Sequence, residues 1–271
     1  LPLAASLAAV AATSPYAVMR TPGIIVVVPE GQCMAGQNYA VGVDGAGSGW
    51  IGVRRKDDGL EWHWFENAEH VIRKNPRAGV IAVDIPIGLA ESDARPSDRL
   101  AREFVGGLRA SSVFSAPIRS VLGAATRREA SDAQERVDGR GLAAQAFALF
   151  PKIRLWDHLM RTDEGVRAKV REIHPEVSFA AMQGGKGCGI VEPKRTPEGQ
   201  HIRSELLASR FGRATVDDLL RDVPKKLAAP DDVLDALAAL WSAERILAGT
   251  AQTLPSPVAI DSVGLVMAIW Y

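Results

Sequence analysis

The sequence predicts a mixed α/β fold in which three antiparallel strands are followed by parallel strands with helical insertions. Residues 38–44, 50–55 and 61–66 are β-rich and are separated by Gly-rich or Asp-Gly turns, as in consecutive hairpins. Residues 79–86, GVIAVDIP, are almost continuously apolar, which is typical of a strand buried on both faces of a parallel sheet. Helical patterns dominate from there to the C-terminus.

The later elements are placed by capping residues, breakers and periodicity. The residues from 231 onward show a broad apolar stripe at helical spacing. The expected elements are a helix with Ser97 as N-cap ending at Gly106, a helix over 141–161 bent or broken at Pro151, a strand over 170–174, and helices over 196–211 and 231–248.

The composition is that of a globular protein without overall charge. The chain has 271 residues, 47% of them hydrophobic, and 32 basic side chains balance 32 acidic ones. Because the whole chain does not attract a polyanion, any nucleic-acid site must be local. Two cysteines, Cys33 and Cys188, cannot build a disulfide framework or a structural zinc site, and a reducing cytoplasm is therefore expected.

The N-terminal segment differs from the rest of the chain. It begins Ala-rich, contains no motif, and has no charged side chain in its first 19 residues. A signal peptide or weak membrane anchor is the alternative interpretation, but the basic region that precedes such segments is absent. We therefore expect residues 1–36 to be a disordered or non-native extension, and residues 37–271 to form a single domain without a membrane anchor.

Carboxylates stand at the ends of predicted strands. Asp44 closes the first strand and Asp84 the fourth, and ligands of open α/β sheets bind beyond strand ends. If these two strands are neighbours, both side chains face one site. Glu176 follows the fifth strand, in the sequence His174-Pro175-Glu176. His174 is either an acid or base or a hydrogen-bonding residue at the strand end, and the second role is favoured.

The last predicted helix contributes further carboxylates. Asp235 lies three or four residues after Asp232 and Asp231, so that this spacing places them on one helical face. The residues beside them on this helix are small, which would let it approach the sheet closely: Ala236, Ala238, Ala239 and Ser242.

An acidic cluster with no Cys and little His favours a hard cation bound through oxygen, Mg²⁺ or Mn²⁺. Two such ions about 4 Å apart activate a water and stabilise the leaving oxygen in phosphodiester cleavage. Without the ions, several unpaired anions so close together would take up protons. Each Asp alone is more typical of a turn or a helix cap, and Asp231 or Asp232 can cap the last helix. It is the joint pattern that indicates a metal site.

Eight motifs in register resemble one known family. They are VGVDGAGSGW, VDIPIGL, RPSDRLAR, SSVFSAP, PKIRLWD, IHPEVSF, KRTPEG and DDVLDALAALWSA. Together they cover the chain from about residue 39 to the C-terminus and resemble domain-of-unknown-function family 429, a group of predicted nucleases with an RNase-H-like fold. In the family pattern an acidic residue usually stands where this chain has Leu155, and a proline where it has Ser115.

The resemblance implies roles for the carboxylates. Asp44 and Asp84 take the positions of the sheet carboxylates of an RNase-H-like fold. Asp232 and Asp235 are similar to the helical acidic pair of RuvC-type Holliday-junction resolvases, and Glu176 is a fifth candidate. The expected metal ligands are Asp44, Asp84, Asp232 and Asp235, and the expected catalytic residues are Asp44, Asp84, Glu176 and Asp235.

Basic residues near the motifs are candidates for contacts to a phosphate backbone, although surface Lys and Arg are usually only solvated. Lys152 and Arg195 are the preferred candidates. The others are Arg154, Lys186, Lys194 and Arg203.

The sequence therefore predicts a Mg²⁺- or Mn²⁺-dependent phosphodiester hydrolase acting on DNA or RNA. Two alternatives remain open. The Gly-rich residues 44–49 resemble the first phosphate loop of sugar-kinase and actin-like ATPases, which favours nucleotide binding, but a second Gly-rich phosphate loop is absent. A non-catalytic scaffold with the same fold is the third possibility. Ser48 lies in no GxSxG motif, which argues against a serine hydrolase.

Overall fold

The computed structural model describes residues 16–21, 24–29 and 38–271. The chain divides into two compact units, Leu1–Gln37 and Asn38–Tyr271. In the first unit, β1 (Tyr16–Thr21) pairs antiparallel with β2 (Ile24–Pro29), a hairpin that the sequence analysis does not predict. The extension expected over residues 1–36 otherwise falls on residues outside the described ranges.

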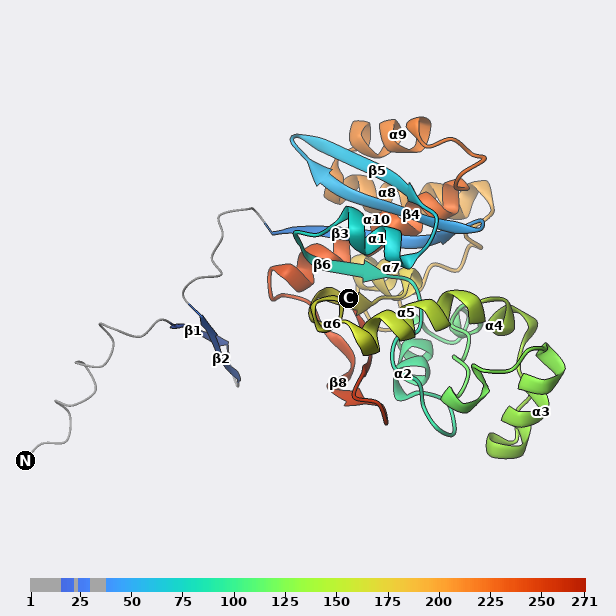
Figure 1. The fold of residues 1–271 in the computed structure, drawn as a ribbon. Coiled ribbons are helices and arrows are strands. Elements are labelled where there is room, and N and C mark those ends of the chain that lie inside the picture. The colour runs from blue at the N-terminus through green and yellow to red at the C-terminus, as the bar shows by residue number, and fades with distance from the viewer. Residues whose placement is uncertain (1–15, 22–23, 30–37) are drawn as a thin grey trace, which may run out of the picture. The chain divides into compact units, whose positions relative to one another are not determined.

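A five-stranded mixed sheet forms the centre of the second unit (Figure 1). Its strands are β3 (Tyr39–Ala46), β4 (Gly49–Lys56), β5 (Gly59–Phe65), β6 (Ala78–Val83) and β7 (Val170–Glu172), in the spatial order β5-β4-β3-β6-β7. The first three pair antiparallel, and β3, β6 and β7 pair parallel. The predicted mixed α/β fold, with three antiparallel strands followed by parallel ones, is confirmed at this level.

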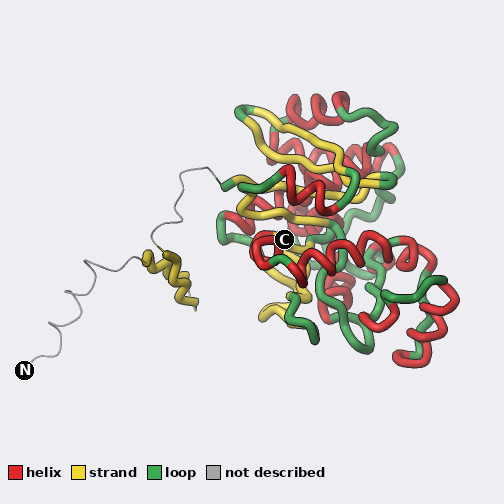
Figure 2. The backbone as a smooth tube through the Cα atoms, viewed as in Figure 1, coloured by secondary structure: helices red, strands yellow, loops and turns green. Residues whose placement is uncertain are grey.

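Ten helices surround this sheet in the described residues 38–271, and Figure 2 shows helical segments on both sides of the strands. They are α1 (Ala68–Lys74), α2 (Pro96–Val105), α3 (Arg127–Asp138), α4 (Ala144–Ala148), α5 (Phe150–Thr162), α6 (Glu164–Lys169), α7 (Pro175–Gln183), α8 (Pro197–Phe211), α9 (Arg213–Asp222) and α10 (Pro230–Leu247). None of the helices in the described ranges is long and apolar enough to span a membrane.

The two faces of the sheet bury different residues of the same strands. Val41 and Val43 of β3 join a core cluster with buried residues of α1, α3, α4, α5 and α6. Ala40 and Ala46 join a second cluster with α7, α8, α9 and α10. Because side chains alternate along a strand, Gly42 and Asp44 belong to the α10 face, as do Val80 and Ala82 of β6.

Helix α10 lies directly against β3 at a glycine. A Cβ at Gly42 would stand 2.0 Å from the backbone nitrogen of Leu240 and 2.2 Å from the carbonyl oxygen of Ala236. The helix face that makes this approach is buried and rich in small residues, as the sequence analysis expects. Gly42 therefore sets how closely the carboxylates of α10 approach those of the sheet.

A buried arginine ties the start of α2 to the parallel edge of the sheet. Arg95 forms ion pairs with Asp98 and, at 2.7 Å, with Glu172 at the end of β7. Its Nη1 also donates to the carbonyl oxygens of Ile87 at 3.1 Å and Gly88 at 3.0 Å. These contacts fix the segment that follows β6 and the end of β7, the two places from which Asp84 and Glu176 emerge.

Three predicted helix boundaries differ from the structure. Ser97 is not an N-cap, because α2 begins at Pro96 with Arg95, held in its buried ion pairs, in the capping position. The helix expected over 141–161 is two helices, α4 and α5, and Pro151 lies in the first turn of α5, where a missing N–H costs nothing. Helix α10 begins at Pro230 rather than at residue 231.

The sequence analysis also misses the C-terminal hairpin. Strands β8 (Thr253–Ile260) and β9 (Val266–Trp270) form a separate antiparallel sheet, and Ile173 makes a bridge to Trp270. Pro255 and Pro257 interrupt the alternation of apolar residues in β8 and so hide the strand. The hairpin packs against α2, where Ile269 and Tyr271 complete a third core cluster.

We expect Gly42→Ala to destabilise the protein by about 3 kcal/mol or more, because the added methyl group would collide with the backbone of α10. Urea denaturation followed by circular dichroism measures this. Gly59→Ala is the matched control, since the nearest atom to its Cβ would be 3.9 Å away, and its cost should be below about 1 kcal/mol. Equal stability of the two variants would contradict the close packing described for α10.

Candidate functional site

Three carboxylates from distant parts of the chain lie together at one edge of the sheet. Asp44 belongs to β3, Asp84 follows β6 directly, and Asp235 lies on α10. The backbone N–H of Asp84 donates to the carbonyl oxygen of Val43 at 3.1 Å, so that β3 and β6 deliver Asp44 and Asp84 side by side. Asp44 and Asp235 are only 5% and 2% exposed, whereas Asp84 is partly exposed.

Burial and mutual repulsion raise the proton affinity of this cluster. Burial raises the pKa of Asp44 well above its usual range, and the charges of Asp235 and Asp84 raise it further. Burial raises the pKa of Asp235 to about 7, although Lys194 opposes the shift. The arrangement therefore stores electrostatic repulsion that a bound cation would relieve.

Lys194, from the segment before α8, supplies the positive charge in the structure. Its Nζ lies 2.6 Å from Oδ2 of Asp235 and 3.8 Å from Oδ2 of Asp231. Burial opposes its charged form, but the surrounding carboxylates, Asp235 first, outweigh burial and raise the pKa of Lys194. Oδ1 of Asp235 is buried and has no hydrogen-bond partner among the residues that the structure describes.

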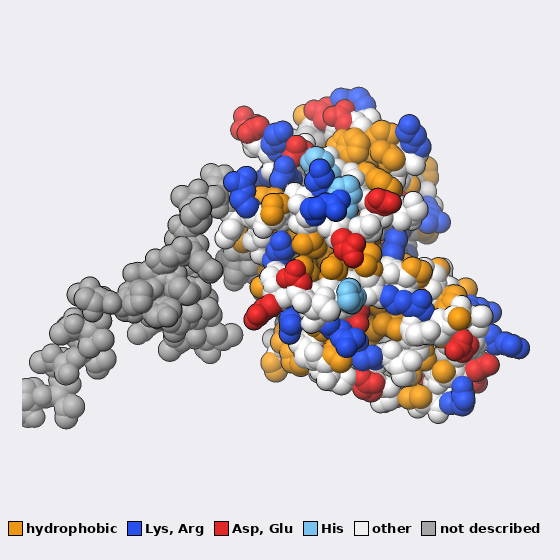
Figure 3. Space-filling model, viewed as in Figure 1, with side chains coloured by type: hydrophobic (Ala, Val, Ile, Leu, Met, Phe, Trp, Pro, Cys, Tyr) orange, Lys and Arg blue, Asp and Glu red, His pale blue; other side chains and the backbone are white. Residues whose placement is uncertain are grey.

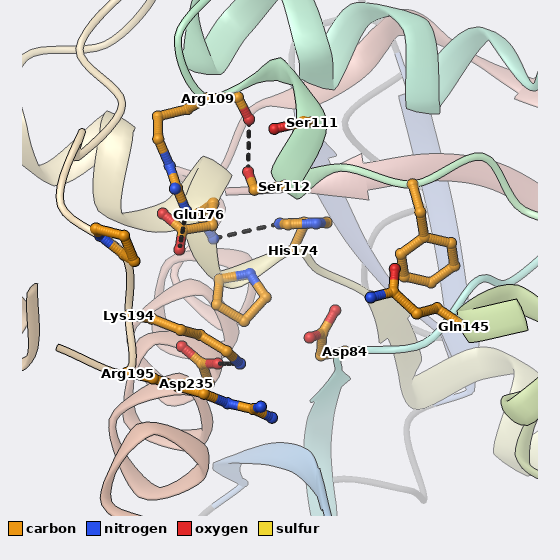
Figure 4. A pocket seen from close by; sticks show the side chains of 13 residues that line it. Asp84, Arg109, Ser111, Ser112, Gln145, His174, Glu176, Lys194, Arg195 and Asp235 are labelled. Atoms are coloured by element: carbon orange, nitrogen blue, oxygen red, sulfur yellow. Dashed lines mark hydrogen bonds and ion pairs between the residues drawn. The ribbon is translucent and has the colours of Figure 1, made fainter. Parts of the chain in front are cut away.

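A cavity of about 420 Å³ opens beside the cluster (Figure 4). Asp84, Asp235 and Lys194 form one wall, and the opposite wall carries Arg109 and Ser112. The remaining lining residues are Ser111, Phe114, Gln145, His174, Pro175, Glu176, Pro193 and Arg195.

Arg109, Ser112 and Gln145 are the site residues that sequence reasoning missed. Arg109 and Ser112 lie in the segment after α2, and Gln145 lies on the short helix α4. The motif SSVFSAP points to this region but does not include Arg109. These segments are too short or too irregular to show a periodic pattern, so only the folded chain brings the three side chains to the cavity.

The other predicted carboxylates occupy different positions. Asp232 accepts a hydrogen bond from the backbone N–H of Ala229 at 3.1 Å through Oδ2, so that it caps α10, one of the two roles considered for it. Oε1 of Glu176 accepts from Arg203 at 2.7 Å and from Arg109 at 3.2 Å. Oε2 of Glu176 is buried and has no partner. Glu176 therefore lines the cavity but is tied to two arginines.

His174 has the structural role favoured by the sequence analysis. Its Nδ1 accepts a hydrogen bond from the backbone N–H of Glu176 at 3.2 Å and caps α7. Leu155 packs against the core cluster on the sheet face opposite α10. The position where the family pattern usually has an acid therefore lies away from the face that carries Asp44 and Asp235.

The preferred phosphate candidates flank the cluster. Nζ of Lys152 donates to the carbonyl oxygen of Gly49 at 3.0 Å and lies 4.7 Å from the ring centroid of Trp50. Burial lowers the pKa of Lys152, although the charge of Asp44 opposes this shift. Arg195 is 85% exposed in its side chain, and its Nε lies 3.5 Å from Asp231 at the cavity. Lys152 is thus engaged beside Asp44, whereas Arg195 is available to a ligand.

The remaining basic candidates divide into structural and unassigned residues. Arg154 donates to the carbonyl oxygens of Leu122 and Ala124, and Arg203 is fully buried, so that both stabilise the fold. Lys186 lines a different cavity. On the face shown in Figure 3, basic and acidic side chains are interspersed, in agreement with the neutral composition.

The Gly-rich residues 44–49 form a tight turn. Gly45 and Ala46 pair with Trp50 and Gly49 in the β3–β4 ladder, which leaves only Gly47 and Ser48 at the tip. Because the ladder engages most of this segment, few backbone N–H groups remain to surround a phosphate. This geometry weighs against the nucleotide-binding alternative.

The residues present fit a hard cation in their chemistry. The donors are carboxylate oxygens, two of them buried, and one oxygen of Asp235 has no partner. Within the described ranges, no group of three or more His, Cys, Asp or Glu side chains is already arranged to hold a metal ion. Lys194 now provides the neutralising charge, so a cation must draw the carboxylates together and displace its ammonium group.

Comparison with known proteins gives one match. The model of a family described as a protein of unknown function (DUF429) matches residues 42–260. No curated protein and no solved structure matches the chain. The matched range includes every carboxylate described above.

We expect Asp44→Asn to stabilise the metal-free protein at pH 8. A carboxyl whose pKa is raised on folding contributes its full stability only below its usual pKa, and loses it as the pH rises through the folded value. The gain should be on the order of 1 kcal/mol and should shrink at pH 5. Urea denaturation in EDTA measures it, with the exposed Asp58→Asn as control. A less stable Asp44→Asn protein at pH 8 would contradict the repulsion described above.

Proposed function

Because the chain belongs to the DUF429 family, whose description gives no activity, we propose its function from the site: metal-dependent phosphodiester hydrolysis on a nucleic acid. The observation that carries this proposal is the convergence of Asp44, Asp84 and Asp235 beside a cavity, with a buried unpartnered oxygen on Asp235. Such a set of oxygen donors suits Mg²⁺ or Mn²⁺.

The strand order supports an RNase-H-like assignment of the fold. The order β5-β4-β3-β6-β7 has an antiparallel half and a parallel half, the coarse arrangement that the sequence pattern predicts. Asp44 lies in β3, Asp84 directly follows the neighbouring β6, and Asp235 comes from α10, which packs against both strands. These are the positions assigned by the resemblance to the sheet and helical carboxylates.

Bound divalent ions would supply an activated water and would stabilise the leaving oxygen of the scissile phosphodiester. Asp44 and Asp235 would hold the ions from the buried side, and Asp84 would hold them from the open side. The cavity wall opposite them offers the guanidinium of Arg109, which can orient a phosphate by charge-assisted hydrogen bonds. Arg195, exposed at the same cavity, can contact a neighbouring phosphate.

Asp232 is not one of the metal ligands in this proposal. One of its oxygens caps α10 and is therefore less available than the oxygens of Asp235. Glu176, paired with Arg203 and Arg109, positions Arg109 at the cavity. The proposal thus places Asp44, Asp84 and Asp235 in the ligand set, and gives Glu176 a supporting role.

Cleavage of labelled substrates tests the proposal. We expect Mn²⁺-dependent cleavage of at least one member of a panel of single-stranded, double-stranded and junction DNA and RNA. Asp44→Asn and Asp84→Asn should each reduce the rate by at least about a thousandfold, since metal ions contribute several kcal/mol to such reactions. Asp58→Asn, at an exposed turn, should leave the rate unchanged.

Two results would contradict this function. Equal cleavage by the wild type and Asp44→Asn would identify a contaminating nuclease. Absence of both cleavage and Mn²⁺ binding would favour a non-catalytic scaffold, and Mn²⁺ binding that appears only with a nucleotide would favour the phosphoryl-transfer alternative.

We expect Lys194→Met to bind Mn²⁺ at least about tenfold more tightly than the wild type, because the ammonium group competes for the same carboxylates and repels the ion. Isothermal titration calorimetry measures the affinity. Arg195→Met is the control, since its more exposed charge should change the affinity by less than about threefold. Weaker Mn²⁺ binding by Lys194→Met would show that the ion does not replace the ammonium group.

A further inference from the structure

A second cavity, of about 410 Å³, lies at the C-terminal ends of α2, α7, α8 and α10. Arg245 of this cavity and Asp235 of the carboxylate site are ten residues apart on α10, which places them about 15 Å apart along the helix. The cavity is lined by Phe104, Ala181, Gly184, Gly185, Lys186, Arg210, Trp241, Arg245, Gln252 and Tyr271.

The lining of this cavity carries charge of one sign. Lys186, Arg210 and Arg245 are its charged side chains, and no Asp or Glu side chain lines it. None of the three forms an ion pair with a carboxylate in the residues that the structure describes. In a chain with 32 basic and 32 acidic residues, three neighbouring cations without a carboxylate are a local excess of positive charge.

The partial negative charges of the neighbouring helix C-termini do not neutralise all of this positive charge. Cations commonly stand at helix C-termini, each of which is equivalent to roughly half a negative charge. Four helix ends therefore offset about 2 of the three positive charges, and an excess of about 1 remains. An anion is the ligand that such an excess attracts.

The contacts of these side chains leave donors free. Arg245 lies over the ring of Trp241 and donates from Nη2 to the carbonyl oxygen of Thr250 at 2.8 Å, and its Nε is buried without a partner in the described residues. Lys186 and Arg210 are exposed and make no side-chain hydrogen bond in the described part of the chain. The cavity thus offers one guanidinium held in place by stacking and two cations that can close on a ligand.

The loop after α7 shapes the entrance. Gly184, Gly185 and Gly187 have positive φ, and no atom lies within 4 Å of the place where a Cβ of Gly185 or Gly187 would stand. Their backbone N–H groups donate to carbonyl oxygens of Ala180 and Phe104. The loop therefore turns tightly and presents Lys186, so that the ligand contacts come from side chains.

We propose that this cavity binds the dianionic phosphate group of a phosphate monoester. Two guanidinium groups and an ammonium group match a group with two negative charges and three acceptor oxygens better than they match a singly charged diester. A phosphorylated small molecule and the 5′-phosphate end of a nucleic acid both carry this group. The inference is independent of the proposed hydrolysis, because it uses none of the carboxylates near Asp44.

Calorimetric titration in EDTA tests the inference. The probes are orthophosphate, adenosine 5′-monophosphate, and one oligonucleotide prepared with a 5′-phosphate and with a 5′-hydroxyl. We expect Lys186→Ala and Arg210→Ala each to weaken binding about tenfold or more, while Arg128→Ala, an exposed cation on α3, leaves it unchanged. Circular dichroism melts check that the variants, whose side chains are exposed, fold as the wild type does.

The probes identify the source of the phosphate. Preference for the 5′-phosphorylated over the 5′-hydroxyl oligonucleotide would identify a nucleic-acid end, and tighter binding of the mononucleotide than of either oligonucleotide would identify a small molecule. Absence of binding, or binding that Lys186→Ala and Arg210→Ala leave unchanged, would overturn the inference.

Discussion

The contact between β3 and α10 at Gly42 is the constraint on which the site depends. Any side chain at residue 42 would push the helix away from the sheet, because backbone atoms of Ala236 and Leu240 occupy that space. With the helix in contact, Asp235 lies one residue before the contact at Ala236, and Asp44 lies two residues beyond Gly42 on the same sheet face. A residue without a side chain thus brings two buried carboxylates together.

The carboxylate cluster of Asp44, Asp84 and Asp235 lowers the stability of the metal-free protein, because it concentrates negative charge. Burial and repulsion raise the pKa of Asp44 and of Asp235, and Lys194 compensates only in part. Functional sites often retain such unfavourable arrangements, because the interaction that destabilises the free protein is the one that binds the ligand. Arg95 is a contrasting case, since this buried charge is paired with both Asp98 and Glu172, whereas Oδ1 of Asp235 has no partner among the described residues.

The sequence was sufficient for the parts of the fold that depend on local pattern. Apolar runs located the strand that contains Asp44, which continues two residues further than predicted, and the strand before Asp84. Small residues indicated the close approach of α10. The sequence was insufficient where tertiary contacts determine a helix boundary or the position of a side chain. Arg95 rather than Ser97 precedes α2 because buried carboxylates hold it, and Arg109 reaches the cavity from an irregular segment without a recognisable pattern. Ion pairs between distant residues, such as Lys194 with Asp235, leave no mark on local composition.

Helix α10 is in effect a rigid spacer. Its backbone contacts Gly42 of β3 at Ala236 and Leu240, so the helix cannot shift along the strand without losing this contact. Asp235 lies on one side of the contact, and Arg245 lies toward the C-terminal end of the helix. The separation of Asp235 from Arg245 is consequently fixed by the helical rise and not by the flexibility of any loop. A ligand that contacts both Asp235 and Arg245 must therefore span this fixed distance.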